Sequence, residues 1–395
     1  MRLQRTRREA HMRWWIPALA TLAFVLSACS TTSGPENQQN PLRPKGKYAE
    51  EIDNLFGPIF WVSVVIGVLV ITATIVVALR YRVRKGDDVR PKQTHGSTPL
   101  EIGWTIVPAV ILLAVAVPTV STIFSLDEEP KNPIEITAVG KQWWWQFDYP
   151  RDDNGKKVVT ANDMHIPVDR DVLVTLTACD ESLPNPTEIE GTGCNVLHSF
   201  WVPELGGKRD VVPGRDNQLK IRADEEGVYL GQCAEYCGLS HANMKFRVIA
   251  ESASEYEAWL EEQRGEAAVA LEDSADVEKL FTSKFQCTNC HTSEDSSLST
   301  YGPNLTHFAS REVFASGYYE LTRERLIEWL LDAPSLIPMQ SEDCRLGSPG
   351  SVEGAVCVGM PSFTKNPPEG SEGQSFPAMT REEAEILADY LLSLT

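Results

Sequence analysis

The chain is short of positive charge. Its 395 residues include 36 Lys and Arg against 55 Asp and Glu, which gives a formal net charge of -19 at pH 7. This balance argues against nucleic acid as a partner and suits attraction of a basic protein instead. The sequence also lacks an internal repeat, and its length allows about two or three domains. Cysteine is not scarce, because nine cysteines are many for a protein of a reducing compartment.

The segment Trp14–Ala28 contains no charged residue. It follows an arginine-rich start, and its last residues, Leu26-Ser27-Ala28, precede Cys29. A short apolar run of this kind predicts a cleaved export signal over residues 1–28, with an uncleaved anchor as the alternative. The sequence Leu-Ser-Ala-Cys resembles the processing box of bacterial lipoproteins. That resemblance implies that Cys29 is lipidated and begins a periplasmic lead-in over residues 29–54.

Two later segments, Pro58–Leu79 and Ile102–Leu126, also lack charged residues. Each is long enough to cross a bilayer, which takes about 20 apolar residues. The loop between them is rich in Arg and Lys, so the positive-inside rule places it in the cytoplasm. We therefore expect a transmembrane helical hairpin over residues 55–126 of a protein in the bacterial plasma membrane. Both remaining parts of the chain would then lie on the outer, periplasmic face.

After Asp127 the sequence changes to short β-branched segments separated by Gly, Pro and Asp. The clearest of these segments are Ile134–Val139, Val172–Thr177, Gln218–Arg222 and Phe246–Ile249. This pattern predicts an antiparallel β-sandwich or barrel over residues 127–250.

The rest of the chain favours helices. An acidic stretch predicts a solvated helix and linker over residues 251–274. Helical periodicity in Leu321–Leu331 and Arg381–Leu394 then predicts a separate all-α domain over residues 275–395. Thr380 and Glu383 have the spacing of a capping box at the start of the last helix.

Soft sulfur donors and imidazoles gather in one segment of the predicted β domain. Cys233, Cys237, His241 and Met244 fall within twelve residues, and His198 lies upstream. Sulfur together with imidazole selects copper, and a second cysteine allows two thiolates to bridge two copper ions. Zinc is a poorer match because a Met does not serve it. A disulfide between the two cysteines would leave the following His and Met unexplained.

This segment resembles the dinuclear copper A site of cytochrome c oxidase subunit II. The resemblance implies a cupredoxin-like Greek-key β-sandwich and six copper ligands, one of them a backbone carbonyl. The matching positions are His198, Cys233, Glu235 through its carbonyl, Cys237, His241 and Met244. In the family the side chain of the residue at Glu235 also binds magnesium at the contact with subunit I.

Two more residues match positions with known roles in that family. Trp143, the first tryptophan of Trp-Trp-Trp, stands where the electron enters over the copper. Glu101 stands at the mouth of a proton path in subunit I. The alternatives are an ordinary aromatic core residue for Trp143 and a helix-start acid for Glu101.

Cys287-Thr-Asn-Cys290-His291 is the attachment pattern of a c-type haem. The two thiols add to the haem vinyl groups, and the adjacent His reaches the iron. A lone Cys-x-x-Cys could be a redox dithiol or half of a zinc site, but the His and the export signal favour haem. Tyr301-Gly-Pro-Asn-Leu305 resembles the loop after the haem in small cytochromes c, where the carbonyl of the Pro, here Pro303, orients the axial His.

A Met on the opposite face of the iron raises the potential of a c-type haem. Met360 lies in Gly-Met-Pro-Ser-Phe, which resembles the axial Met turn of the family, and Met339 and Met379 are the alternatives. The insertion Gln340–Val358 holds two cysteines that we expect to pair, and a second pair flanks a Pro-rich loop. These possible disulfides are Cys344–Cys357 and Cys179–Cys194. Four other histidines, expected at the surface, are His11, His95, His165 and His307.

Residues 45–250 therefore resemble subunit II, and residues 275–395 resemble a class I cytochrome c. Together they are similar to the bacterial caa-type haem-copper oxidases, in which the cytochrome is fused to subunit II. The resemblance implies that electrons pass from a donor through haem c and copper A to the haem-copper centre of subunit I. Oxygen is reduced to water there, and protons are pumped. The transmembrane segments lack the several His ligands that such a centre needs, so we expect no catalytic residue in this chain.

The expected partners are oxidase subunits I and III, membrane lipid, and a donor such as a soluble cytochrome or a quinol-cytochrome c reductase complex. Fusion would raise the effective concentration of the haem near the copper to about millimolar. Three other readings remain. They are a quinol oxidase subunit, whose family lacks the copper ligands, the copper A subunit of a nitric oxide reductase, and a metal-free, disulfide-rich surface lipoprotein.

Overall fold

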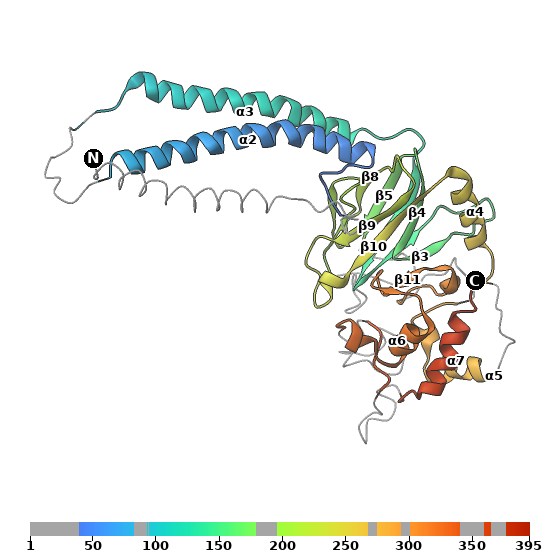
Figure 1. Cartoon of the computed structure of the whole chain (residues 1–395). Coiled ribbons are helices and arrows are strands. Elements are labelled where there is room, and N and C mark those ends of the chain that lie inside the picture. Colours follow the sequence, from blue (N-terminus) through green and yellow to red (C-terminus); the bar gives the residue numbers. More distant parts are fainter. Residues whose placement is uncertain are drawn as a thin grey trace, which may run out of the picture. The chain divides into compact units, whose positions relative to one another are not determined.

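The computed structural model describes residues 39–82, 93, 95–178, 196–267, 275–293, 301–339, 359–364 and 377–395. At the start of this part, two long helices run side by side (Figure 1): α2 spans Lys47–Arg80 and α3 spans Thr98–Asp127. Ser125 near the end of α3 donates a hydrogen bond to Glu51 near the start of α2, over 2.9 Å, so the pair is antiparallel.

The two helices contain the two uncharged segments and are long and apolar enough to cross a membrane. Their large apolar side chains are exposed along most of their length. Such a surface is stable only against lipid or another apolar protein surface. The predicted transmembrane hairpin is confirmed as a pair of helices.

A β-sandwich follows the hairpin. Its ten strands are β1 (Ile134–Lys141), β2 (Trp144–Asp148), β3 (Val159–Ala161), β4 (Asp163–Pro167), β5 (Val172–Thr177), β6 (His198–Trp201), β7 (Lys208–Val211), β8 (Asn217–Ile221), β9 (Gly227–Cys233) and β10 (Lys245–Glu251). They form two five-stranded sheets, ordered β3-β2-β1-β5-β8 and β4-β10-β9-β6-β7. All four strands expected from the sequence are present. The expectation of a wholly antiparallel arrangement was wrong, because β1 pairs with β5, and β4 with β10, in parallel.

The core of the sandwich is aromatic. The side chains of Trp145, Phe147, Phe200 and Phe246 are fully buried. Their rings contact one another with centroids 4.5 to 6.5 Å apart, the range in which aromatic pairs attract beyond simple burial. Such close packing gives the loops at the end of the sandwich a rigid base.

The C-terminal part is mainly helical, which is consistent with the expected all-α domain, although it also contains a short β-hairpin. It is preceded by α4 (Ala253–Arg264), which starts with a capping box between Ser252 and Glu255. Its own elements are α5 (Ala275–Glu278), a π-helical segment (Lys279–Lys284), two 3-10 turns (Cys287–Asn289 and Phe308–Ser310), α6 (Arg323–Leu336), α7 (Arg381–Leu391) and a short hairpin of β11 (Val313–Phe314) and β12 (Tyr319–Glu320). The capping box at Thr380 and Glu383 is confirmed. The helix α6 is kinked at Asp332, two residues before Pro334, because a proline inside a helix has no N–H donor and its ring clashes with the carbonyl four residues earlier.

Gly231 in β9 provides a test of the core packing. A Cβ at this position would overlap the ring of Phe246. We expect Gly231→Ala to lower the free energy of unfolding by about 1–3 kcal/mol, the usual cost of overpacking. Thermal unfolding of the purified chain measures this change. Gly207→Ala is the control, because its Cβ would meet only Ile52 at 3.5 Å. Equal midpoints for the two variants would contradict the packing described here.

Candidate functional site

The cysteine-rich segment is a loop closed at its neck by backbone hydrogen bonds. Cys233 ends β9, and its N–H donates to the carbonyl of Met244 over 2.9 Å. The next residue, Lys245, begins β10 and pairs with Gln232. Strand β6 begins with His198 and lies beside β9, with Phe200 opposite Cys233. Three neighbouring strands of one sheet thus bring the expected donors to the same end of the sandwich.

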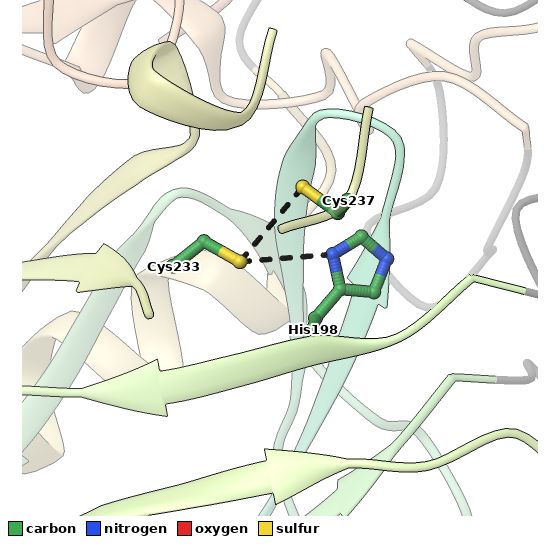
Figure 2. A group of neighbouring side chains, drawn as sticks. All are labelled: His198, Cys233 and Cys237. Atoms are coloured by element: carbon green, nitrogen blue, oxygen red, sulfur yellow. Dashed lines mark hydrogen bonds between the residues drawn. The ribbon is translucent and has the colours of Figure 1, made fainter. Parts of the chain in front are cut away.

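The two sulfurs lie at the centre of this donor set. Cys233 Sγ is 3.9 Å from Cys237 Sγ and 3.9 Å from Nδ1 of His198, whose ring nitrogen points at the sulfur in Figure 2. Cys237 Sγ is 3.6 Å from Nδ1 of His241 and 3.7 Å from Sδ of Met244. The structure therefore brings these side chains together as the sequence suggested.

The sixth donor is also in place, because the carbonyl oxygen of Glu235 is 3.2 Å from Cys233 Sγ. Both cysteines are free thiols. Their separation is far longer than a disulfide bond of about 2.05 Å, so the disulfide alternative for this pair was wrong.

Burial and electrostatics make this set suitable for a soft cation. His198, Cys237 and Met244 are at most 1% exposed. The hydrogen bond between the sulfurs lowers the pKa of Cys233 to about 3 and raises the pKa of Cys237. A thiolate is the form of cysteine that binds a metal, so the lowered pKa of Cys233 suits ligation. A buried thiolate without a counter-ion is costly, so the donor set fits a bound metal.

Two neighbours fix the backbone at Cys237. The amide Nε2 of Gln142 and the indole Nε1 of Trp143 both donate to the carbonyl of Cys237, over 2.7 and 2.9 Å. Gly140 gives the ring of His198 its space, since a Cβ there would lie 2.9 Å from the ring carbon Cδ2. Sequence reasoning missed Gln142 and Gly140. A glycine inside a strand pattern is the one signal that could have indicated such a close approach.

The second candidate site lies in the helical domain, where Cys287 and Cys290 are free thiols on a tight turn. Burial raises the pKa of Cys287 to about 12 and the pKa of Cys290 to about 11, so both thiols are protonated. Nδ1 of His291 lies 2.7 Å from the carbonyl oxygen of Pro303. A carbonyl can only accept, so Nδ1 carries the proton and Nε2 keeps its lone pair.

The environment of His291 also suits a metal ligand. Burial lowers the pKa of His291, which keeps its imidazole neutral. A Cβ at Gly302 would lie 2.6 Å from the ring carbon Cε1, so this glycine provides space for the ring. Cys287, Cys290 and His291 line one pocket together with Trp143 and Trp144 of the β domain.

Two of the three candidate axial methionines line this pocket, Met339 and Met360. The backbone N–H of Met360 donates to Sδ of Met339 over 3.2 Å. Met360 packs against the core of the helical domain, whereas Met339 packs against the core of the β domain. Met379 lies in the helical core and is only 7% exposed.

Two histidines expected at the surface are covered, so that expectation was wrong for them. His165 stacks on Trp259 of α4, with ring centroids 4.0 Å apart, and His307 is only 5% exposed. Their sequence neighbours carry no sign of this, because the cover comes from distant segments. His95 is exposed, and Glu101 lies in the first turn of α3.

Other predicted residues lie outside the described ranges, so their assignments stay predictions. They are His11, Cys29, Cys179, Cys194, Cys344 and Cys357.

Comparison with known proteins places the chain in a family. A family model described as cytochrome c oxidase subunit II, transmembrane domain, matches residues 44–122. A second, described as the periplasmic domain of the same subunit, matches residues 134–252. The β-sandwich is thus the cupredoxin-like domain expected from the sequence.

Individual relatives extend the match beyond these two domains. Cytochrome c oxidase subunit 2 of Alkalihalophilus pseudofirmus is 36% identical over 383 residues, or 95% of each chain. Its counterpart in Bacillus subtilis is 31% identical and covers 81% of this chain and 88% of its own. Quinol oxidase subunit 2 of Bacillus spizizenii is 33% identical over 66% of this chain and 75% of its own. From the paired domain matches and a relationship that runs almost end to end, we conclude that this chain belongs to the cytochrome c oxidase subunit II family.

Proposed function

We propose that this chain receives electrons at a covalently bound haem c and passes them through a dinuclear copper A centre to subunit I of a terminal respiratory oxidase. Membership of the subunit II family supports the role of electron input to an oxidoreductase complex. The observation that carries the proposal is the convergence of sulfur, imidazole and carbonyl donors around the two unbonded sulfurs of Cys233 and Cys237.

The copper ligands that we propose are the six residues recognised in the sequence. The bound ions would exchange single electrons while sharing the two thiolates. The fold contributes by restricting the movement of the ligand residues. The closed neck between β9 and β10 fixes the ends of the loop, and Gln142 and Trp143 fix its middle at the carbonyl of Cys237. Because the donors are held rigidly, the reorganisation energy of the site stays small when the copper ions gain or lose an electron.

For the haem, we propose covalent attachment at Cys287 and Cys290, with His291 and Met360 as axial ligands. Such a haem supplies reversible one-electron chemistry at a potential set by the axial ligands. Pro303 holds His291 in the tautomer that leaves Nε2 free for iron. The thiols and the imidazole are neutral in their buried setting, as attachment and ligation require.

Trp143 connects the two sites. Its side chain lines the pocket that contains Cys287 and His291, and its indole N–H donates to Cys237. We propose that the electron crosses at this residue, so Trp143 is where electrons enter the copper site. The residue is 8% exposed, which excludes solvent from the route.

The remaining assignments concern partners. The side chain of Glu235 is exposed, which leaves its carboxylate free to bind magnesium at a contact with subunit I. Glu101, in the first turn of α3, is proposed at the mouth of a proton path in that subunit. Neither α2 nor α3 contains a histidine, which supports an oxygen-reducing centre in a partner subunit. Subunit III, membrane lipid, and a soluble cytochrome or reductase complex as donor complete the proposed partners.

The relationship to a quinol oxidase subunit suggests a second candidate function. The six copper donors favour the cytochrome c oxidase, since quinol oxidase relatives are expected to lack them. A copper A subunit of a nitric oxide reductase would share the site described here, and the active-site metal of the partner chain distinguishes the two.

Export through a cleaved signal over residues 1–28 and lipidation of Cys29 complete the proposal.

Removing one bridging sulfur tests the copper assignment. We expect Cys237→Ser to abolish the near-infrared mixed-valence absorption and most of the bound copper, because a hydroxyl is a poor copper bridge. Covalent haem should be unchanged. Optical spectra and copper analysis of the purified chain measure both. Ala234→Ser is the matched control, since it adds a hydroxyl to the same loop without removing a donor. An unchanged copper content and an unchanged near-infrared band in Cys237→Ser would contradict the assignment of a copper A centre to this site.

Gly140 tests whether the space for His198 matters. We expect Gly140→Ala to weaken copper binding about 10- to 100-fold, the usual effect of disturbing a group that orients a ligand. Every proposed ligand remains in this variant, so the loss would come from displacement of the ring. Copper titration of the metal-free chain gives the affinity. Gly206→Ala is the control, because its Cβ would meet only Lys220 and Ile221 at 3.4 Å or more. Equal copper affinities of Gly140→Ala and Gly206→Ala would show that the His198 ring tolerates a Cβ at position 140, contrary to this prediction.

Single substitutions distinguish the two axial candidates. We expect Met360→Ala to lower the midpoint potential of the haem, because a thioether ligand raises it, and to leave the covalent bonds intact. Met339→Ala should change the potential much less. Redox titration followed by haem absorption measures both. The opposite ranking would move the axial role to Met339.

A further inference from the structure

The turn between β11 and β12 of the helical domain contacts the outer face of β10 in the copper domain. We propose that this hairpin (residues 312–320), here called the docking hairpin, holds the haem domain against the copper domain in a fixed position over Trp143. The proposal deepens the proposed function and rests on it. It makes the fused haem domain a docked donor rather than a tethered domain that diffuses.

Strand β10 presents two cations to the hairpin. Side chains alternate between the faces of a strand. The side chains of Phe246 and Val248 are buried in the sandwich core. Lys245 and Arg247 therefore face the other way, toward the hairpin. Arg247 is nonetheless only 8% exposed, because the helical domain covers it.

Arg247 is positioned by a partner in its own domain. Its Nε and Nη2 donate to the two carboxylate oxygens of Asp163, over 2.9 and 2.7 Å. The two residues face each other in the parallel pair β4 and β10. A two-point contact of this kind fixes a guanidinium in orientation as well as in place. The remaining Nη1 donates to Glu312 of the docking hairpin over 3.0 Å.

The tip of the hairpin adds a contact at the proposed electron route. Ser316 Oγ donates to the backbone carbonyl of Trp143 over 3.3 Å, and both residues are less than 10% exposed. Lys245 Nζ lies 4.5 Å from the ring centroid of Tyr318, within reach of a cation–π contact. Ala315 and Ser316 have left-handed backbone, with φ of 52° and 60°. Non-glycine residues adopt this conformation at a cost, which the contacts of the tip offset.

A second contact lies on another side of the same pocket. Ser240, beside the donor His241, donates from Oγ to the carbonyl of Pro338 over 2.6 Å. The next residue, Met339, packs against the core of the copper domain. Ser240, Ser316 and Met339 all line the pocket that contains Cys287 and His291. Two separate segments of the helical domain therefore hold that pocket against the copper domain.

The Glu312 end of the ion pair is exposed. An exposed pair alone contributes little, so the buried hydrogen bond of Ser316 is the stronger element. The test therefore changes both residues. The double variant Glu312→Arg/Ser316→Ala places a cation against Arg247 and removes the hydroxyl at Trp143. Glu320→Arg makes the same charge change on an exposed residue of the same hairpin and is the control.

The first readout is amide hydrogen exchange of the full chain, followed by mass spectrometry over peptides 311–321 and 141–144. In the double variant we expect exchange at least about tenfold faster in both peptides, the change expected when a buried hydrogen bond and an ion pair are lost. Glu320→Arg should match the original chain. Equal exchange in the double variant and the control would overturn the docking proposal.

The second readout is the rate constant of electron transfer from haem to copper within one molecule. A docked haem gives a rate independent of solvent viscosity, and we expect the double variant to be slower and to depend on viscosity. A viscosity-dependent rate in the original chain would overturn the proposal. Haem and copper contents are measured in the same samples. A chain that binds neither contradicts the proposed function, whereas a loaded chain with an unprotected hairpin contradicts docking alone.

Discussion

Two sulfurs that lie close together without bonding are the constraint on which the rest of the structure depends. Cys233 and Cys237 are 3.9 Å apart, buried, and surrounded by imidazole, thioether and carbonyl donors. A disulfide would be the simplest outcome for two such thiols in an oxidising compartment. The loop geometry holds them apart, and the imidazole and thioether donors around them suit a soft cation. The neck hydrogen bond between Cys233 and Met244 and the hydrogen bonds to the carbonyl of Cys237 help to keep this arrangement.

The sandwich provides the rigidity. Its aromatic core fixes the ends of β6, β9 and β10, so that the donors on separate strands stay in register. The hydrogen bonds from Gln142 and Trp143 to the carbonyl of Cys237 tie the loop to the opposite sheet. Trp143 also contacts the helical domain through its own carbonyl. One short turn therefore contacts the sulfur loop, the pocket lined by Cys287 and His291, and the hairpin between β11 and β12.

Much of this could be predicted from local sequence. Short-range patterns such as Cys233–Met244, Cys287–His291 and Thr380–Glu383 carry their chemistry within a few residues, and the structure brings each of them together. Contacts between distant segments could not be predicted. The roles of Gly140, Arg247 and Ser316 depend on which strand or turn lies opposite, and the covering of His165 and His307 depends on segments far away in the chain. The parallel strand pairs could not be predicted for the same reason. The alternation of apolar and polar residues indicates a strand, but it does not indicate which strand lies beside it or in which direction that strand runs.

The claim that two thiolates hold a pair of copper ions as one electron reservoir is tested most directly by electron paramagnetic resonance of the purified, copper-loaded chain. One unpaired electron shared equally by two copper nuclei gives a hyperfine pattern from both nuclei, and this is the spectrum we predict at the Cys233–Cys237 site. The hyperfine pattern of a single copper nucleus would contradict the claim, as would a chain that binds no copper.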